Sequence, residues 1–218
     1  MTTHAPVFAG IRPLPPDTLS FAPDTAVRAF VVERDHGNIL VYNSESTAEH
    51  VRGHDIRWHY LNHWHEGMWG LDGVAAAHGA PVLVHAEDRD ETVRTSGCFR
   101  PHRTFRERHQ LGEGFELIPI PGHTPGATAF LYERGDHRFL FTGDSLYLRD
   151  GEWVAAVLET SDRAAYLESL ELVRDLDFDV LVPWAATAAG PWFALTDAAD
   201  RRARIAKIMD RLWTGQDH

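Results

Sequence analysis

The spacing of hydrophobic and polar residues predicts a chain in which short strands alternate with helices. Apolar runs with the composition of β-strands occupy residues 26–32, 38–43, 56–63, 81–88, 115–120, 127–133, 137–144 and 179–184. Helical spacing or composition occupies residues 46–53, 71–80, 161–176 and 197–213. Gly37 and Gly135 lie between consecutive strands and predict two hairpins. This order of elements predicts a mixed α/β chain built in layers.

Composition narrows the class of protein. The 218 residues suit one domain, 1–218, with a full core, and the hydrophobic and charged fractions of 44% and 24% are ordinary for a globular protein. A formal net charge of -11 without a Lys/Arg run argues against nucleic acid as a partner. The chain shows no signal peptide and no apolar run long enough to cross a membrane, so we expect no membrane association and a cytoplasmic location. Nothing in the composition predicts an oligomeric state.

The single cysteine, Cys98, excludes an internal disulfide and a zinc site built from cysteines. Histidine is the abundant candidate ligand, with 14 residues. His63 and His65 are two apart after an apolar run, so in an extended segment both side chains point the same way and can reach one ion. His123 lies among glycines and prolines that permit a tight turn, which can add a third imidazole.

Two short motifs support a specific resemblance. PGHTPG, at Pro121 to Gly126, and FTGD, at Phe141 to Asp144, occur in this order beside the second predicted hairpin. With the two early histidines they resemble the metallo-β-lactamase family, over a span from about Val27 to Val182. The resemblance implies a four-layer αββα sandwich of the α/β (α+β) class. It also implies hydrolysis of a small-molecule ester, thioester, lactone or amide.

The first and last family motifs are incomplete. Family members have His-x-His-x-Asp-His and a late Pro-Gly-His, but here Gly67 and Met68 replace the first Asp-His pair. Trp184 and Ala185 replace the last Gly-His. The resemblance therefore implies one complete metal site and a second site that keeps only Asp144.

We expect one zinc ion, bound by His63, His65 and His123, with its fourth position open to water. Asp144 could complete the metal's shell or orient the bound water, which makes it both a candidate ligand and the candidate catalytic residue. Iron is the alternative: His63, His123 and Asp144 would form the two-histidine, one-carboxylate set of a mononuclear oxygenase. A non-catalytic binding domain is a third reading. The metal content of the purified protein distinguishes these three hypotheses: zinc favours the hydrolase, iron favours the oxygenase, and no metal favours the binding domain.

The residues around the predicted ligands suggest an apolar substrate pocket formed by Trp64, Met68, Trp69 and Trp184. Glu66 is one position out of phase with the missing aspartate, so in an extended segment it is expected to face solvent. His59 and His85 are predicted to be core or surface histidines.

Arg100, Arg103 and Arg106 recur at helical spacing. They predict the solvated face of a surface helix or, alternatively, an anion site.

Overall fold

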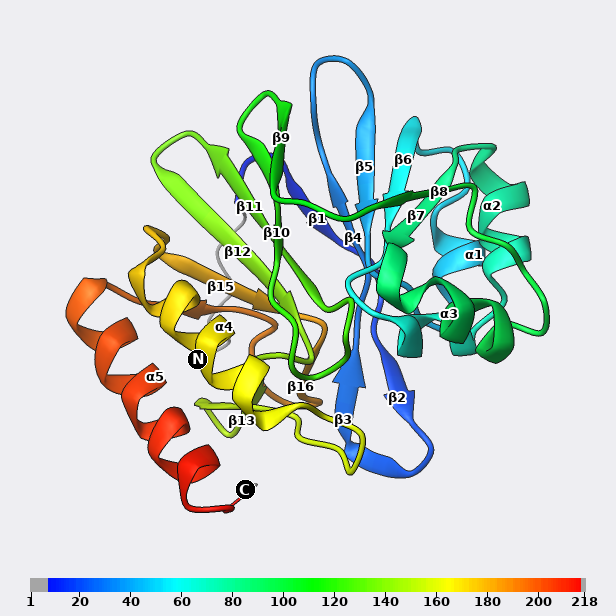
Figure 1. Ribbon diagram of the computed structural model, residues 1–218. Coiled ribbons are helices and arrows are strands. Elements are labelled where there is room, and N and C mark those ends of the chain that lie inside the picture. The colour runs from blue at the N-terminus through cyan, green and yellow to red at the C-terminus, as the bar shows by residue number, and fades with distance from the viewer. Residues whose placement is uncertain (1–7, 217–218) are drawn as a thin grey trace.

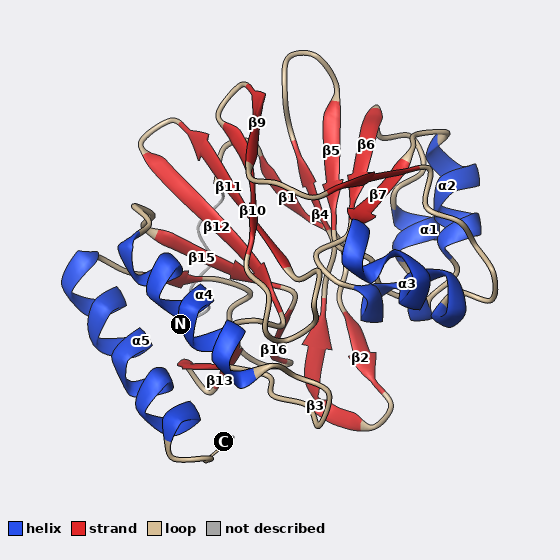
Figure 2. Ribbon diagram, viewed as in Figure 1, coloured by secondary structure: helices blue, strands red, loops and turns tan. Residues whose placement is uncertain are grey.

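The computed structural model describes residues 8–216, and its helices lie on the outer sides of two central sheets (Figure 1). One side is covered by α1 (Thr47–His50), α2 (Leu71–His78) and α3 (Arg89–Thr95). The other is covered by α4 (Arg163–Asp175) and α5 (Ala198–Trp213), as Figure 2 shows. The four-layer αββα arrangement expected from the sequence is therefore confirmed.

Within the described residues, both central sheets have six strands. The first has the spatial order β1 (Ile11–Pro13), β4 (Phe30–Val32), β5 (Asn38–Val41), β6 (Ile56–Tyr60), β7 (Val82–His85) and β8 (Arg103–Phe105). The second has the order β17 (Ala194–Leu195), β15 (Val180–Pro183), β12 (His137–Gly143), β11 (Thr128–Arg134), β10 (Phe115–Pro119) and β9 (His109–Gly112).

A third sheet lies beside the ends of the other two. Its order is β14 (Glu152–Val154), β13 (Tyr147–Arg149), β16 (Ala185–Thr187), β3 (Ala22–Val27) and β2 (Asp17–Leu19). Two short 3-10 helices complete the elements, η1 (Trp64–Met68) and η2 (Ala86–Asp88). The sequence did not predict the third sheet, α3 or the 3-10 helices, because these short elements have no regular hydrophobic period of their own.

Alternate residues along the strands of the second sheet point to opposite faces, so the same strands contribute to two hydrophobic cores. Phe139 and Phe141 of β12 pack between the two central sheets, whereas Leu140 packs under α4 and α5. This is the period-two pattern of a strand buried on both faces. From α4 and α5, Tyr166 and Ile205 pack into the same outer core as Leu140. The sandwich thus follows from strands that are apolar at almost every position.

The two predicted hairpins are present. β4 and β5 pair antiparallel, with Phe30 opposite Val41, and β11 and β12 pair antiparallel, with Phe130 opposite Phe141. The strand predicted over residues 56–63 ends earlier, at Tyr60, where the chain leaves the sheet toward η1. Among residues 8–216, no helix is both long and apolar enough to cross a membrane.

Candidate metal centre

The structure brings together the four residues that the sequence predicts as metal ligands. His63 and His65 follow β6, and His123 lies in the turn between β10 and β11. Asp144 comes directly after β12. One nitrogen or oxygen atom from each residue lies within 4.8 Å of those of the others. We call this group of His63, His65, His123 and Asp144 the ligand cluster.

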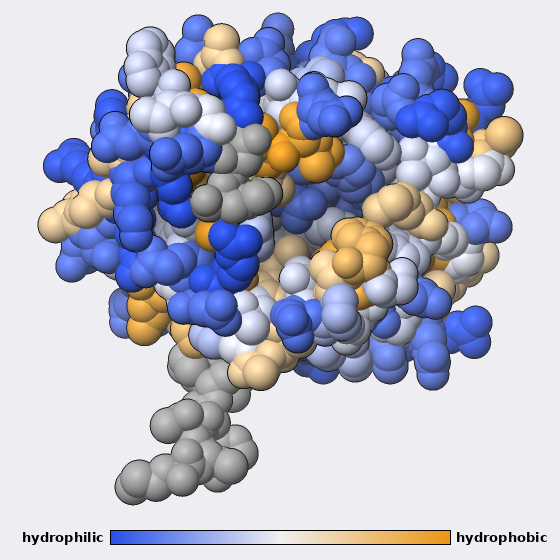
Figure 3. Space-filling view, turned by 90° about the horizontal axis from the view of Figure 1, so that it is seen from below, coloured by the Kyte–Doolittle hydropathy of each residue, from blue (hydrophilic) through white to orange (hydrophobic). Residues whose placement is uncertain are grey.

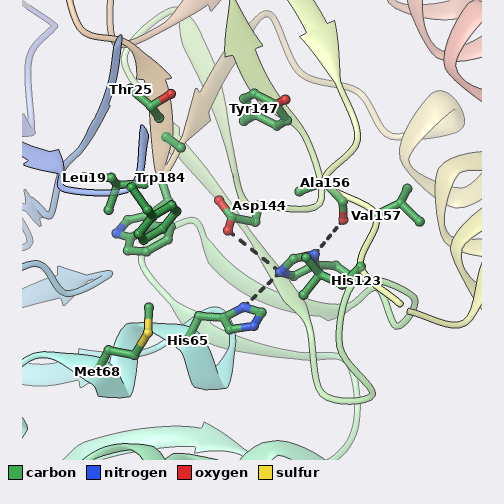
Figure 4. Close-up of a pocket in the computed structure, with 13 residues that line it drawn as sticks. Leu19, Thr25, His65, Met68, His123, Asp144, Tyr147, Ala156, Val157 and Trp184 are labelled. Atoms are coloured by element: carbon green, nitrogen blue, oxygen red, sulfur yellow. Dashed lines mark hydrogen bonds and ion pairs between the residues drawn. The ribbon is translucent and has the colours of Figure 1, made fainter. Parts of the chain in front are cut away.

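Distances within the ligand cluster suit a small metal ion. His65 Nδ1 lies 3.1 Å from His123 Nε2 (Figure 4). Asp144 Oδ2 lies 3.5 Å from His63 Nε2 and 3.8 Å from His123 Nε2. Two nitrogens that are each about 2 Å from one tetrahedral zinc ion lie about 3.3 Å apart. The cluster therefore has donor atoms and spacing that could hold a single metal ion.

His63 gives the clearest sign that the cluster is built for an ion. Its side chain is fully buried, and its Nε2 atom has no hydrogen-bond partner among the described residues. Its other ring nitrogen, Nδ1, lies 3.1 Å from Glu66 Oε1, to which a protonated Nδ1 donates a hydrogen bond. The Nε2 lone pair is then directed at the cluster. A buried polar atom without a partner needs an explanation, and a metal ion supplies one.

His123 is oriented in the same manner. Its Nδ1 atom donates a hydrogen bond to the backbone oxygen of Ala156 at 2.7 Å, which leaves the Nε2 lone pair facing the cluster. Burial lowers the pKa of His63 to about 3 and that of His123 to about 4. Burial and the neighbouring imidazoles lower the pKa of His65 to about 2. All three rings are therefore neutral near pH 7, the form that binds a metal.

Glu66 is buried, so the expectation that it faces solvent is wrong. That expectation assumed an extended segment, but residues 64–68 form the 3-10 helix η1. Side chains three positions apart in a 3-10 helix lie on the same side, which brings Glu66 beneath His63. Its Oε1 atom also accepts a hydrogen bond from the backbone N–H of Asn62. Glu66 thus fixes the ring of His63 through Nδ1, the ring nitrogen that faces away from the ligand cluster.

Asp88 connects the two histidine segments. Its carboxylate accepts hydrogen bonds from the backbone N–H of Trp64, the hydroxyl of Thr124 and the backbone N–H of Gly126. The first belongs to the His63–His65 segment and the other two to the turn that carries His123. Sequence reasoning missed Asp88 and the positioning role of Glu66. An acidic residue three positions after the end of the apolar strand β7 was the available signal for Asp88.

Two glycines allow the turns to approach their neighbours. Gly122 has φ 143°, and a Cβ there would lie 2.4 Å from Tyr166 Cα. Gly143 has φ 57°, and a Cβ there would collide with the side chain of Asn62. Both positions therefore require glycine, and each lies next to a member of the ligand cluster.

Trp184 forms a wall of the site on the side where the family has its second set of ligands. The register of β12 with β15 pairs Gly143 with Pro183, which brings Trp184 beside Asp144. Trp184 is 3% exposed, donates from Nε1 to the backbone oxygen of Asn43 at 2.9 Å, and packs 5.4 Å from the His63 ring.

Neither Gly67 nor Ala185 offers a ligand there. The atoms nearest to a Cβ at Gly67 all belong to Thr92 of α3, starting with its backbone oxygen at 3.3 Å. Ala185 is a buried member of the inter-sheet core. The apolar character predicted for this side from the sequence is present.

A pocket of about 320 Å³ opens beside the ligand cluster. Of the four residues predicted to form a substrate pocket, Met68 and Trp184 line it. Trp64 and Trp69 do not: Trp64 packs at a tilt against His65 with ring centroids 3.7 Å apart, and Trp69 packs against Trp184. Both indoles support the site from outside the pocket. Adjacent residues in η1 point in different directions, which is why proximity in sequence did not predict a shared wall.

The three arginines do not form a helical face, and that expectation is wrong. Arg103 lies in strand β8, where it packs over the ring of Trp58. Arg106 pairs with Glu87. None of Arg100, Arg103 and Arg106 lines the pocket among the described residues. As predicted, His59 is buried, with its Nε2 bonded to the backbone oxygen of Tyr42, and His85 is nearly buried.

Comparison with known proteins supports the fold and the family. A family model described as the metallo-beta-lactamase superfamily matches residues 68–185. A hydroxyacylglutathione hydrolase from Anaeromyxobacter dehalogenans is 30% identical over 169 residues, covering 71% of this chain and 60% of the relative. One from Pseudomonas entomophila is 28% identical over 89 residues, covering 39% of this chain and 31% of the relative. The chain thus spans less than two thirds of these curated relatives.

Solved structures give the same fold. The metallo-beta-lactamase FIM-1 from Pseudomonas aeruginosa, in its mono-zinc form, has a TM-score of 0.73 and 15% identity, covering 97% of this chain and 94% of its own. GOB-18 from Elizabethkingia meningoseptica has a TM-score of 0.64 and 16% identity, covering 86% and 85%. The family model matches more than half of the chain, including the turns that carry His123 and Asp144. The chain belongs to the metallo-beta-lactamase superfamily.

Proposed function

We propose that the protein is a metal-dependent hydrolase with one zinc ion held by His63, His65 and His123. Its substrate is a small ester, thioester, lactone or amide. The observation that supports this most strongly is the fully buried His63 Nε2 atom, which lacks a partner and faces two further imidazoles and a carboxylate. Family membership supports hydrolysis, and the named relatives are hydrolases of a thioester.

Each residue of the site has a role that follows from its position. A bound zinc ion would supply Lewis acidity and lower the pKa of its water to about 7. Asp144 is 17% exposed and reaches both the cluster and the pocket, so it can accept a hydrogen bond from that water and orient it. The bonds to Glu66 and to the Ala156 backbone hold His63 and His123 with their Nε2 atoms inward. Trp184 excludes water from the other side of His63.

A single metal fits this site better than a pair. A second dication needs several oxygen or nitrogen ligands, and the side of the site occupied by Trp184 and Ala185 offers no such side chain beyond Asp144. We therefore expect slower hydrolysis than in a relative with two metals, because no second ion helps to hold the leaving group.

The iron alternative would use only His63, His123 and Asp144 as ligands. Against it stands the position of His65, whose Nδ1 atom lies 3.1 Å from His123 Nε2 and belongs to the same cluster. Three imidazoles favour zinc. Against a purely binding role stands the pocket, which gives a substrate access to His65, His123 and Asp144.

Metal content and chelation test the proposal. Protein purified without added metal is expected to carry about one equivalent of zinc per chain by elemental analysis. Hydrolysis of p-nitrophenyl butyrate should disappear on chelation and return with zinc. His123→Ala should lose both metal and activity, while the exposed control His109→Ala keeps both. One equivalent of iron, or no hydrolysis by fully zinc-loaded protein, would contradict the proposal.

A further inference from the structure

The pocket beside the ligand cluster has a mainly apolar wall. Its 13 lining residues include Leu19, Phe21, Met68, Val157, Leu158 and Trp184. These side chains come from the end of β2 and the turn after it, from η1, from the loop after β14 and from the residue after β15. In Figure 4, Leu19, Met68 and Trp184 lie on one side of the ligand cluster and Val157 on the other. Separate parts of the chain thus supply apolar walls on both sides of the ligand cluster.

Exposed hydrophobic side chains are concentrated at this pocket. In the described residues, six large hydrophobic side chains are exposed, and three of them, Phe21, Met68 and Leu158, line it. Much of the face seen from below in Figure 3 is hydrophilic, with hydrophobic residues in small separate groups. Exposed apolar side chains that gather at one cavity indicate a binding site, whereas single exposed apolar side chains scattered over the surface need no explanation.

The charges of the pocket exclude one class of substrate. None of the 13 lining residues is lysine or arginine. The only carboxylate is Asp144, at the ligand cluster, and the formal net charge of the whole chain is -11. A carboxylate on the part of a ligand that lies away from the ligand cluster would therefore lose hydration and gain no lysine or arginine in return. The arginines Arg103 and Arg106, which could have served, are held by Trp58 and Glu87.

The polar groups are placed so as to orient a ligand. His65, His123 and Asp144 are together at the cluster, and the remaining polar side chains of the lining are Thr25 and Tyr147. A molecule with one polar carbonyl end and one apolar end would place the carbonyl at the cluster and the rest against Met68 and Leu158. Glutathione conjugates, which carry two carboxylates, do not match this lining.

We infer that this pocket binds the uncharged, apolar part of the substrate, an alkyl or aryl chain, and discriminates against anionic chains. The inference rests on the proposed hydrolase function for the role of the ligand, but the binding preference itself does not require hydrolysis.

A matched pair of ligands tests the preference. Octanamide and suberamic acid share an amide head and a chain of the same length, and differ in a terminal methyl group or a terminal carboxylate. Calorimetric titration of the full-length protein, as purified and again after chelation, should show octanamide binding at least about tenfold more tightly. Equal affinities, tighter binding of suberamic acid, or binding of neither ligand would overturn the inference.

A charge introduced at the pocket should alter this ratio. Leu158→Lys places a cation among the lining residues and is expected to reduce the preference for octanamide by about fivefold or more. Leu172→Lys is the matched control, because Leu172 is a similarly exposed leucine on α4 outside the lining. It should leave the ratio unchanged. An equal change in both variants would assign the effect to overall charge and contradict the inference.

The two proposals fail separately. A protein that binds octanamide selectively but hydrolyses no ester refutes the proposed hydrolase and leaves the pocket assignment intact. A protein that hydrolyses the p-nitrophenyl monoester of adipate as fast as p-nitrophenyl hexanoate refutes the pocket assignment and leaves the hydrolase intact.

Discussion

The two sides of the candidate metal centre differ in the number of side chains that could bind a metal ion. On one side, three imidazoles and a carboxylate converge, and buried acceptors hold two of the rings with their free nitrogens inward. On the other, the buried indole of Trp184 forms the wall, and its N–H donates a hydrogen bond to the backbone oxygen of Asn43. Both sides rest on the same strand ends and the same Asp144. One half of a paired metal site can therefore be replaced by packing while the other keeps its support.

That support comes from residues outside the ligand cluster. Glu66 fixes His63, and Asp88 ties the segment of His63 and His65 to the turn of His123. Neither contact involves Trp184 or Ala185. The ligand cluster thus has supporting contacts of its own, separate from the side of the site at Trp184 and Ala185.

The largest effect is expected from removing a ligand on the polar side. His63→Ala removes one of three imidazoles, so zinc affinity should fall by more than about 100-fold, beyond the range typical of losing an outer partner. Competition with a fluorescent zinc chelator measures it. His109→Ala, at an exposed histidine, is the control and should match the wild type. Retention of tight zinc binding by His63→Ala would place the metal elsewhere.

A smaller loss should follow from removing the carboxylate behind His63. Glu66→Ala leaves Nδ1 of His63 without its acceptor, and zinc affinity should fall by about 10–100-fold. Glu66→Gln keeps an acceptor oxygen and should lie between this variant and the wild type. Glu87→Ala, at an exposed glutamate, is the control. If Glu66→Ala binds zinc as tightly as the wild type, the contact between Glu66 and His63 has no positioning role.

On the apolar side, the expected effect is on stability. Trp184→Phe loses the hydrogen bond to Asn43 and some packing, which should lower the free energy of unfolding by about 1–2 kcal/mol. Urea denaturation measures the change, and zinc content should stay at one equivalent. Trp213→Phe, at a tryptophan that is 79% exposed, should change stability by less than about 0.5 kcal/mol. A loss of zinc in Trp184→Phe would mean that the two sides are coupled.

No gain of metal is expected when the missing ligands are restored alone. The triple variant Gly67→Asp, Met68→His, Ala185→His supplies the family's ligand types, yet Trp184 still fills the space and a side chain at position 67 starts against Thr92. Calorimetry with zinc should show one site. Adding Trp184→Gly should open the space for a second ion. Two-site binding by the triple variant with Trp184 intact would show that the indole is no obstacle.

The errors made from sequence share one cause. Glu66 was placed by treating the residues after β6 as an extended segment, and Trp64 and Trp69 were placed by their proximity in sequence to the predicted ligands. The 3-10 helix η1 turns there and changes which side chains share a side. Arg100, Arg103 and Arg106 were placed by helical spacing, but the segment contains strand β8. In both segments the local pattern is short, so packing against α3 and β7 decides the conformation.

The sequence by itself determined the layered α/β fold, the two hairpins and the turns that carry His123 and Asp144. These features depend on local rules: alternating apolar residues, and glycines where the backbone must turn tightly. Only the tertiary structure decided that Glu66 contacts His63, that Asp88 joins the histidine segments, and that Trp184 packs against His63 at the wall of the pocket. Each of these is a contact between segments distant in the chain or within an irregular turn, and a pattern along the sequence carries no information about such contacts until the sheets are packed.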